Sequence, residues 1–443
     1  GLVFEDTRIL IANTITANND VEWLDWDTEQ IVTLDMLRDV DPDNLELAVS
    51  GEVWLKMVKN RPDLAQEFAP KIRVFGRCTP IAKVSIIDMF NKEGNVTLMC
   101  GDGGNDCGAL KTAHVGIAMS EAEASMVAPF TATEKNLTAV VDVLKEGRCA
   151  LASAFASYKF MLMVGLTHNV VQFAAAYFRL TLSPLTWALH DGGWVLSLAF
   201  SLPLAKASRK LAPSRPTSSL LGSHTMHSFL GVLIINVTFL VAAFFVLFGQ
   251  SWFQCRKWEN SFMGTAWGLG DNYESTILFL IPGYQLMATA AAYNFGFAHR
   301  ASWGTNLAFV FFFVFWTILQ LYIILVPSEL SCLLSVNCQE ENTILGMEIS
   351  NVYNTTLMPL DFRWKLVGLL LANLVVVCGW EYFVVNGGEM RRTRRRCEEV
   401  DGAWKLHHHQ DEEQRRPLKP GSSDQLLSSS PSSSRKRSGA QIV

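Results

Sequence analysis

The chain has 443 residues, a formal net charge of −5, 49% hydrophobic residues and 18% charged residues. This composition excludes a disordered chain, a collagen and a small disulfide scaffold. The mild net charge argues against a nucleic-acid-binding protein, which would be strongly basic. The 27 Phe and 13 Trp residues and the mean hydropathy of +0.20 indicate a membrane protein.

Residues 1–150 read as the soluble part of the chain. Residues 96–100 and 115–119 are predicted buried strands, residues 101–106 form a Gly-rich loop, and residues 107–113 allow two helical turns. Strand, loop, helix and strand in this order predict an α/β unit with a parallel sheet. The first residues lack an initiating Met and any signal-peptide pattern. We therefore expect this sequence to be the interior of a longer chain.

Residues 151–385 are predicted to form a bundle of six transmembrane helices. The expected spans lie near 155–178, 185–205, 229–248, 275–295, 305–326 and 366–385. Most of them approach the roughly 20 apolar residues that cross a bilayer. A single segment of this kind is also compatible with a buried core helix, but six in succession with basic connectors favour a membrane domain.

Basic connectors predict the orientation of these spans. Positive residues follow the second, fourth and sixth spans, and the last group is the run at 391–396. By the positive-inside rule, these connectors and the soluble domain are predicted to be cytoplasmic. Residues 250–273 and 328–361 are then predicted to lie on the opposite side of the membrane. Arg256 and Lys257 conflict weakly with this orientation. Asn354 is a predicted glycosylation site there. Cys332 and Cys338 share the second of these loops, and their pairing stays open.

Residues 386–443 form a tail whose composition predicts disorder. It contains a basic run, three consecutive histidines (407–409), acidic residues and a Ser-rich end. We expect the basic run to mark the cytoplasmic membrane edge, where it would contact anionic lipid.

The loop at 101–106 carries the clearest chemical signal. Asp102, Asn105 and Asp106 follow a predicted parallel strand, at the edge where ligands bind in open α/β sheets. Carboxylate oxygens suit Mg²⁺, which also takes phosphate oxygens. A solvated Gly-Asp turn is the alternative. Lys83, about twenty residues upstream, is placed to contact a phosphoryl oxygen as a point charge.

Polar residues inside predicted spans are costly and are candidates for function. In the first span, His168 and Gln172 are four residues apart and share a helix face. The second span contains Trp187, His190 and Asp191, and Asp191 is interpreted as the only acid well inside a span. A carboxylate beside an aromatic ring suits an organic ammonium ion. Hydrogen bonding between adjacent helices is the alternative reading.

Residues 99–111, which read Met-Cys-Gly-Asp-Gly-Gly-Asn-Asp-Cys-Gly-Ala-Leu-Lys, resemble the hinge motif of P-type ATPases. The Cys-Gly-Ala-Leu ending, the stretch at 121–125 and Pro-Phe-Thr at 129–131 resemble the fifth class. Within that class the sequence resembles the B subgroup, the polyamine-transporting ATPases of endolysosomal and vacuolar membranes. Residues 272–276 also resemble that subgroup. The resemblance runs from residue 1 to about 390.

The resemblance implies a haloacid-dehalogenase-like phosphorylation domain, of which residues 1–150 would be the C-terminal part. In this family an aspartate in Asp-Lys-Thr-Gly-Thr accepts the γ-phosphoryl group of ATP. That motif does not occur in this sequence, so we expect the chain alone to be inactive and its nucleotide domain to lie mostly upstream. Asp102 would be a Mg²⁺ ligand, Asn105 and Asp106 would order the site, with Asp106 a further candidate ligand, and Lys83 would contact the phosphoryl group.

The resemblance also bears on the transported species. The polyamine exporters of this family have a carboxylate at the position of Asp191 and an aromatic residue at Trp187, but typically a glutamine where His168 stands. The implied function is ATP-driven movement of a polyamine-like cation across a late endosomal, lysosomal or vacuolar membrane. The alternatives are an A-subgroup dislocase of transmembrane helices in the endoplasmic reticulum and a catalytically inactive membrane scaffold or regulator.

Overall fold

A computed structural model describes residues 8–15, 21–26, 28–32, 45–119, 123–134, 136–212, 214–253, 272–336, 342–344, 347–349 and 357–388. The chain divides into two compact units, Gly1–Asn386 and Gly387–Val443. Asn354, Cys338 and the basic run at 391–396 lie outside the described residues. The predictions made for them therefore remain predictions.

The N-terminal region contains a mixed five-stranded sheet with the order β3-β2-β1-β4-β5. Its strands are β1 (Arg8–Ile15), β2 (Val21–Asp25), β3 (Ile31–Val32), β4 (Leu45–Ser50) and β5 (Ile72–Gly76). β1, β4 and β5 are parallel, whereas β2 and β3 are antiparallel to their neighbours. Helices α2 (Gly51–Asn60) and α3 (Pro62–Phe68) contribute Trp54 and Phe68 to its core, which also contains Trp23.

A second, three-stranded sheet has the order β6-β7-β8 and is parallel throughout. Its elements are β6 (Leu98–Gly101), the 3-10 turn η3 (Gly104–Asp106), α5 (Cys107–Thr112), β7 (Val115–Ala118) and β8 (Phe130–Thr131), preceded by α4 (Pro80–Lys92). The predicted sequence of strand, loop, helix and parallel strand is confirmed here. The haloacid-dehalogenase-like class remains a prediction.

Five helices of the described chain are long and apolar enough to cross a membrane. They are α6 (Thr138–Phe178), α9 (Ser223–Phe248), α10 (Tyr273–Tyr293), α11 (Leu307–Leu325) and α13 (Leu360–Gly379), which η8 (Trp380–Val385) continues. The first expected span was 155–178, but α6 begins at Thr138 because its helix continues without a break through the polar residues before the apolar stretch. Short elements complete this region: η7 (Trp303–Thr305), α12 (Glu329–Leu333), β9 (Asn342–Ile344) and β10 (Met347–Ile349).

The segment expected as the second span is helical but not a single α-helix. It consists of α7 (Pro184–Trp187), the π-helix η5 (Ala188–Val195), α8 (Leu196–Ser201) and the 3-10 turn η6 (Leu202–Leu204). Gly192 and Gly193 lie in η5, and glycine has little preference for α-helical winding. Five uninterrupted spans and one interrupted segment thus stand where six regular helices were expected, and the number of membrane crossings remains a prediction.

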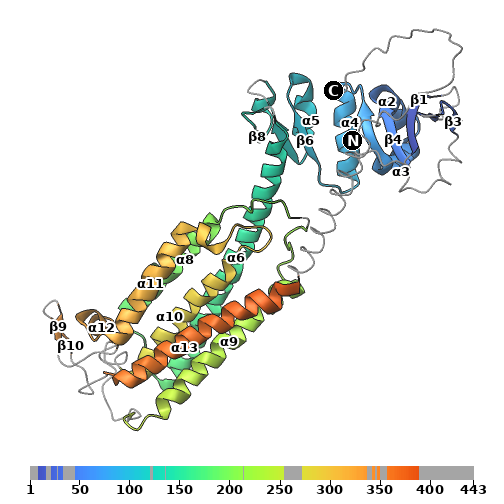
Figure 1. Cartoon of the computed structure of the whole chain (residues 1–443). Helices are drawn as coiled ribbons and strands as arrows, with labels where there is room; N and C mark the ends of the chain where they lie inside the picture. Colours follow the sequence, from blue (N-terminus) through green and yellow to red (C-terminus); the bar gives the residue numbers. More distant parts are fainter. Residues whose placement is uncertain are drawn as a thin grey trace, which may run out of the picture. The chain divides into compact units, whose positions relative to one another are not determined.

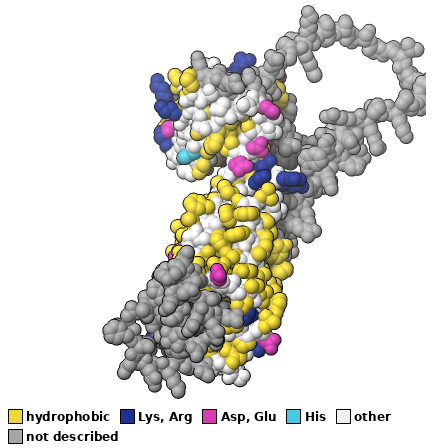
Figure 2. Space-filling view, turned by 90° about the vertical axis from the view of Figure 1, so that its left-hand side faces the viewer, with side chains coloured by type: hydrophobic (Ala, Val, Ile, Leu, Met, Phe, Trp, Pro, Cys, Tyr) yellow, Lys and Arg dark blue, Asp and Glu magenta, His cyan; other side chains and the backbone are white. Residues whose placement is uncertain are grey.

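Helix α10 is the centre of the bundle. Its apolar window is 100% buried, whereas those of the other four helices are 22–39% buried. Figure 1 shows α6, α9, α11 and α13 running alongside α10. Hydrophobic side chains cover most of the described part of the bundle on the face seen in Figure 2. Phe173, Phe245 and Phe311 are among the exposed ones, which is the pattern expected of a surface that faces lipid.

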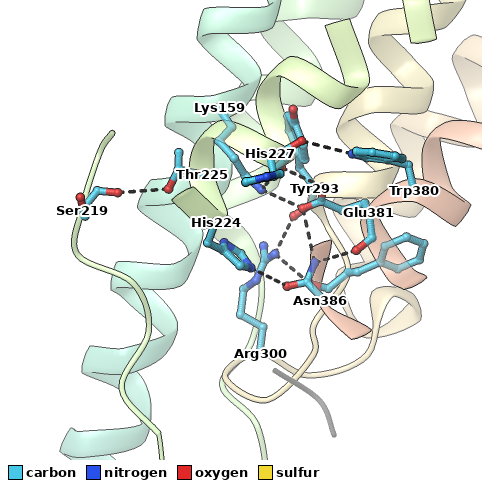
Figure 3. Close-up of polar contacts among 12 residues, drawn as sticks. Lys159, Ser219, His224, Thr225, His227, Tyr293, Arg300, Trp380, Glu381 and Asn386 are labelled. Atoms are coloured by element: carbon cyan, nitrogen blue, oxygen red, sulfur yellow. Dashed lines mark hydrogen bonds and ion pairs between the residues drawn. The ribbon is translucent and has the colours of Figure 1, made fainter. Parts of the chain in front are cut away.

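A buried ion pair ties α6 to η8 across 222 residues of sequence (Figure 3). Lys159 Nζ lies 2.8 Å from Glu381 Oε1 and donates a hydrogen bond to Ser228 Oγ, also at 2.8 Å. Ser228 in turn donates to Glu381 Oε2, and Lys159 lies 4.2 Å from the centre of the Tyr293 ring. The sequence interpretation named Asp191 as the only acid well inside a span. Glu381 corrects this, since it is buried within the last candidate span.

Candidate functional site

The loop at 101–106 begins at the carboxyl end of β6. β6 and β7 pair in parallel from Leu98↔Val115 to Gly101↔Ala118, so both strands end at the same edge. Gly101 is needed because an added Cβ would lie 2.6 Å from Asp106 Cβ and 2.7 Å from Asp106 Oδ2. The absence of a side chain at Gly101 therefore lets the loop fold back and hold the Asp106 carboxylate beside the strand end.

Lys83 and Asp106 form an ion pair at this edge. Lys83 Nζ lies 2.7 Å from Asp106 Oδ1, and the Asp106 side chain is 10% exposed. Lys83 lies in the first turn of α4, where the hydroxyl of Thr79 accepts a hydrogen bond from the Ala82 N–H and caps the helix. The sequence interpretation aimed Lys83 at a phosphoryl group, and in this structure its ammonium group contacts Asp106.

Asp102 and Asn105 lie exposed in the same loop. Burial raises the pKa of the neighbouring Cys100 thiol, and the negative charges of Asp102 and Asp106 raise it further. Both carboxylates therefore contribute negative potential at one strand end. An exposed carboxylate beside a Lys-paired one is a donor set that fits Mg²⁺, a cation that keeps several waters and phosphate oxygens.

A second polar cluster lies within the membrane-spanning region. His168 Nε2 lies 3.1 Å and His190 Nδ1 lies 2.9 Å from the same atom, Asp191 Oδ1. The two imidazole nitrogens are 3.3 Å apart. The Asp191 side chain is 51% exposed and that of His190 is 7% exposed. Three potential ligand or hydrogen-bonding atoms therefore converge on one point, with the carboxylate on the open side.

Two helical segments supply this cluster. His168 comes from α6, whereas His190 and Asp191 are consecutive residues of the π-helix η5. π-helical turns are rare and occur frequently at functional sites. Trp194 anchors η5 against the central helix, because its ring occupies the place that a Cβ at Gly283 of α10 would take. Small residues permit this kind of close helix packing in membranes.

Aromatic rings surround the cluster. The Trp187 ring centre is 5.1 Å from that of His168 and 5.9 Å from that of His190, in edge-to-face arrangements. These three side chains line a cavity of about 10 Å³ together with Leu278 and Phe279 of α10. That volume accommodates about one water molecule.

The structure brings together Asp191, His168 and Trp187 from the predicted substrate residues but not Gln172. Gln172 is exposed one turn further along α6. Two residues on one face of α6 need not both meet η5, and His168 is the one whose side chain lies beside His190 and Asp191. His190 was noted as polar but was not counted among the substrate residues. Its position next to Asp191 in the sequence was the available signal.

Cys332 is disulfide-bonded, whereas Cys78, Cys100, Cys107, Cys149 and Cys378 are free. The partner of Cys332 therefore lies outside the described residues, as Cys338 does.

No family model matches the chain. Among individual proteins, it is 30% identical over 318 residues to "Polyamine-transporting ATPase 13A3" of Homo sapiens, which covers 66% of this chain and 25% of that protein. It is 30% identical over 290 residues to the human "Polyamine-transporting ATPase 13A2", with 66% and 24% covered. It is 28% identical over 396 residues to the "Probable cation-transporting ATPase catp-6" of Caenorhabditis elegans, with 86% and 29% covered.

The chain spans between about a quarter and three tenths of the length of these relatives. The matches extend over most of the chain and include relatives named for transport of polyamines and cations. Over most of its length the chain is therefore similar to polyamine- and cation-transporting ATPases, which agrees with the resemblance to P-type ATPases of the fifth class, B subgroup.

Proposed function

We propose that this chain is the C-terminal part of an ATP-driven transporter that moves a polyamine-like organic cation across an endomembrane through an aspartyl-phosphate cycle. The names of the relatives support transport of a cation, and two of them name polyamines. They give no support to a helix dislocase or an inactive scaffold. The observation that carries the proposal for this chain is the Asp191 carboxylate at the junction of α6 and η5.

In the proposed phosphorylation site, the loop after β6 positions the metal and the phosphoryl group. Asp102 would hold Mg²⁺ through its exposed carboxylate, and the ion would supply positive charge beside the phosphoryl oxygens. Lys83 balances the charge of Asp106, and a small movement of its flexible side chain would let its ammonium group contact a phosphoryl oxygen as well. Asn105 and Asp106 order the loop. ATP binds largely through parts of the protein outside this chain.

In the proposed substrate site, Asp191 binds one ammonium group of the transported cation. In the described chain its charged partners are the two histidines alone, and a neutral imidazole leaves the carboxylate charge uncompensated. Trp187 lies close enough to His168 and His190 for its ring to contribute a cation–π contact. The half-exposed Asp191 carboxylate can be reached from outside, but the adjoining cavity measures about 10 Å³, so deeper entry of the cation requires α6, η5 and α10 to separate.

The test uses the full-length protein and measures dephosphorylation of its phosphoenzyme against spermine concentration. Asp191→Asn should still form phosphoenzyme but lose most of the stimulation by spermine, because loss of a charge partner typically costs a few kcal/mol once the bound cation has displaced water from the pair. Asp361→Asn, at an exposed acid in the first turn of α13, is the matched control and should behave as wild type. A curve for Asp191→Asn that overlays wild type would remove this residue from the substrate site.

His168→Gln should leave the spermine response intact or strengthen it. The amide still donates a hydrogen bond to Asp191, and the change removes a side chain that can become a repelling cation. A loss of stimulation as large as that in Asp191→Asn would contradict this role.

The chain by itself should form no phosphoenzyme, because it contains no Asp-Lys-Thr-Gly-Thr sequence and covalent catalysis requires the nucleophile. Purified chain is incubated with labelled ATP and Mg²⁺. Acid-stable label that hydroxylamine removes would contradict the assignment of the phospho-acceptor to another part of the protein.

A further inference from the structure

We propose that His168, His190 and Asp191 form a binding site for a divalent transition-metal ion of the Zn²⁺ type within the membrane domain. Across the described residues, this is the group of histidine and carboxylate side chains whose ligand atoms all lie within 4.8 Å of one another. The inference concerns a cation chemically different from an organic ammonium ion. It is independent of whether the proposed transport function is correct.

The spacing of the three atoms matches a metal's ligand shell. The separations are 2.9 Å for His190 Nδ1 to Asp191 Oδ1, 3.1 Å for His168 Nε2 to Asp191 Oδ1, and 3.3 Å between the nitrogens. Ligands at about 2.0–2.1 Å from Zn²⁺ in tetrahedral geometry are about 3.3 Å apart. An ion about 1 Å out of the plane of the three atoms would therefore satisfy all three with small side-chain movements.

The ligand types select the metal. Two imidazoles and one carboxylate suit Zn²⁺, Co²⁺ and Fe²⁺, whereas Mg²⁺ and Ca²⁺ prefer sites made of oxygen atoms. Both imidazoles have to present a lone pair, which places their protons on His168 Nδ1 and His190 Nε2. Asp191 supplies one negative charge, so the site lowers the net charge of the bound ion without neutralising it.

The surroundings support a three-ligand site with an open position. His190 is held between Trp187 and Trp194, with ring centres at 5.9 Å and 5.7 Å, and this packing limits the orientations of its ring. The Asp191 side chain is 51% exposed, which leaves room for a water or a substrate group as the fourth ligand. No lysine or arginine of the described chain is paired with Asp191, so no resident cation competes with the metal.

The first experiment measures metal binding directly. The chain is purified in lipid nanodiscs with His407, His408 and His409 replaced by Asn, because a histidine run in the tail also binds metals. Titration with Co²⁺ should give visible d–d bands typical of tetrahedral nitrogen and oxygen ligation, saturating in the micromolar range, and Zn²⁺ should remove them. A thiolate charge-transfer band would place the metal at cysteines and overturn the proposal.

The variants locate the site. His168→Gln, His190→Gln and Asp191→Asn should each weaken Co²⁺ binding by more than the roughly 10- to 100-fold typical of losing an outer-shell partner. His227→Gln changes an exposed histidine of α9 that hydrogen-bonds its own helix backbone, and it should leave the titration unchanged. Co²⁺ binding that survives in all three site variants, or binding only at millimolar metal, overturns the proposal.

A competition arm separates this proposal from the proposed function. If Asp191 also binds an ammonium group, spermine should shift the Co²⁺ titration to higher metal concentration, because both cations need the same carboxylate. Triad-dependent Co²⁺ binding that spermine does not shift would support the metal site and contradict the substrate site. A spermine response that depends on Asp191, without any Co²⁺ binding, would do the opposite.

Discussion

Two acidic side chains in the membrane domain lie on π-helical segments, yet their surroundings are opposite. Glu381 of η8 is 2% exposed and accepts from both Lys159 and Ser228. Asp191 of η5 is 51% exposed, and in the described chain the two histidines are the only side chains within ion-pair distance of its carboxylate. The π-helical backbone therefore does not distinguish the two acids. Their side-chain partners distinguish them, since a fully paired charge stabilises helix packing and an open carboxylate can bind an external cation.

The same contrast occurs in the soluble region. Asp106 is buried and paired with Lys83, whereas Asp102, four residues earlier, is exposed. Each region therefore contains one buried, ion-paired carboxylate and one exposed carboxylate. This arrangement predicts that closed pairs matter mainly for stability and open carboxylates mainly for activity.

The largest effect on stability is expected for Glu381→Ala. Removal of one partner leaves the Lys159 ammonium buried without its counter-charge, which typically costs about 3–5 kcal/mol. Thermal unfolding of the protein in nanodiscs measures this. The double variant Lys159→Met/Glu381→Leu should recover much of the loss, because it removes both charges. A single variant as stable as wild type would break the comparison.

A smaller loss is expected for Gly283→Ala. The added Cβ would overlap the Trp194 ring, and overpacking of this kind costs about 1–3 kcal/mol. Because Trp194 anchors η5, spermine stimulation should fall as well. Gly368→Ala in α13 is the control, since nothing lies within 4 Å of its added Cβ, and its unfolding temperature should stay equal or rise. Equal behaviour of the two variants would argue against this packing role.

In the soluble region, Lys83→Ala and Asp102→Asn should separate stability from activity. Lys83→Ala leaves a largely buried carboxylate unpaired and should cost about 1–3 kcal/mol. Asp102→Asn should change stability by less than about 0.5 kcal/mol, as exposed substitutions usually do, yet abolish Mg²⁺-dependent turnover of the full-length protein. Normal turnover in Asp102→Asn at equal expression would exclude this loop from the active site.

The smallest effect on stability is expected for Asp191→Asn. Its side chain is half exposed and the amide retains hydrogen-bonding capacity toward both histidines, so unfolding should shift by less than about 1 kcal/mol. The same thermal measurement checks this. A destabilisation as large as that of Glu381→Ala would mean that Asp191 mainly joins helices.

Asn354 should be glycosylated, and the modification should be absent from Asn354→Gln. This result tests whether the loop that contains Asn354 lies on the non-cytoplasmic side, and with it the predicted number of membrane crossings. A glycosidase-sensitive mass shift is the readout. Asn354 lies outside the described residues, so this prediction depends on the sequence and the positive-inside rule alone.

The sequence by itself determined the local elements with strong signals. The strand, loop, helix and strand around residues 98–118 were predicted to within two residues of the observed β6, α5 and β7, because glycines and short apolar runs punctuate that stretch. Five apolar segments were likewise located as helices. A run of about twenty apolar residues predicts a membrane-spanning helix, and tertiary contacts do not change that local structure. Asp102 and Asp191 stood out as acids in unusual settings.

Only the tertiary structure decided which polar groups meet. Lys159 and Glu381 are 222 residues apart, and no spacing rule connects them. His168 of α6 meets Asp191 of η5 while Gln172 is exposed, because the rotation of α6 and the position of η5 set those directions. The helices of this bundle are apolar on most sides, so periodicity does not reveal which face turns inward. Side-chain convergence depends on helix rotation and packing, and these are properties of the assembled bundle.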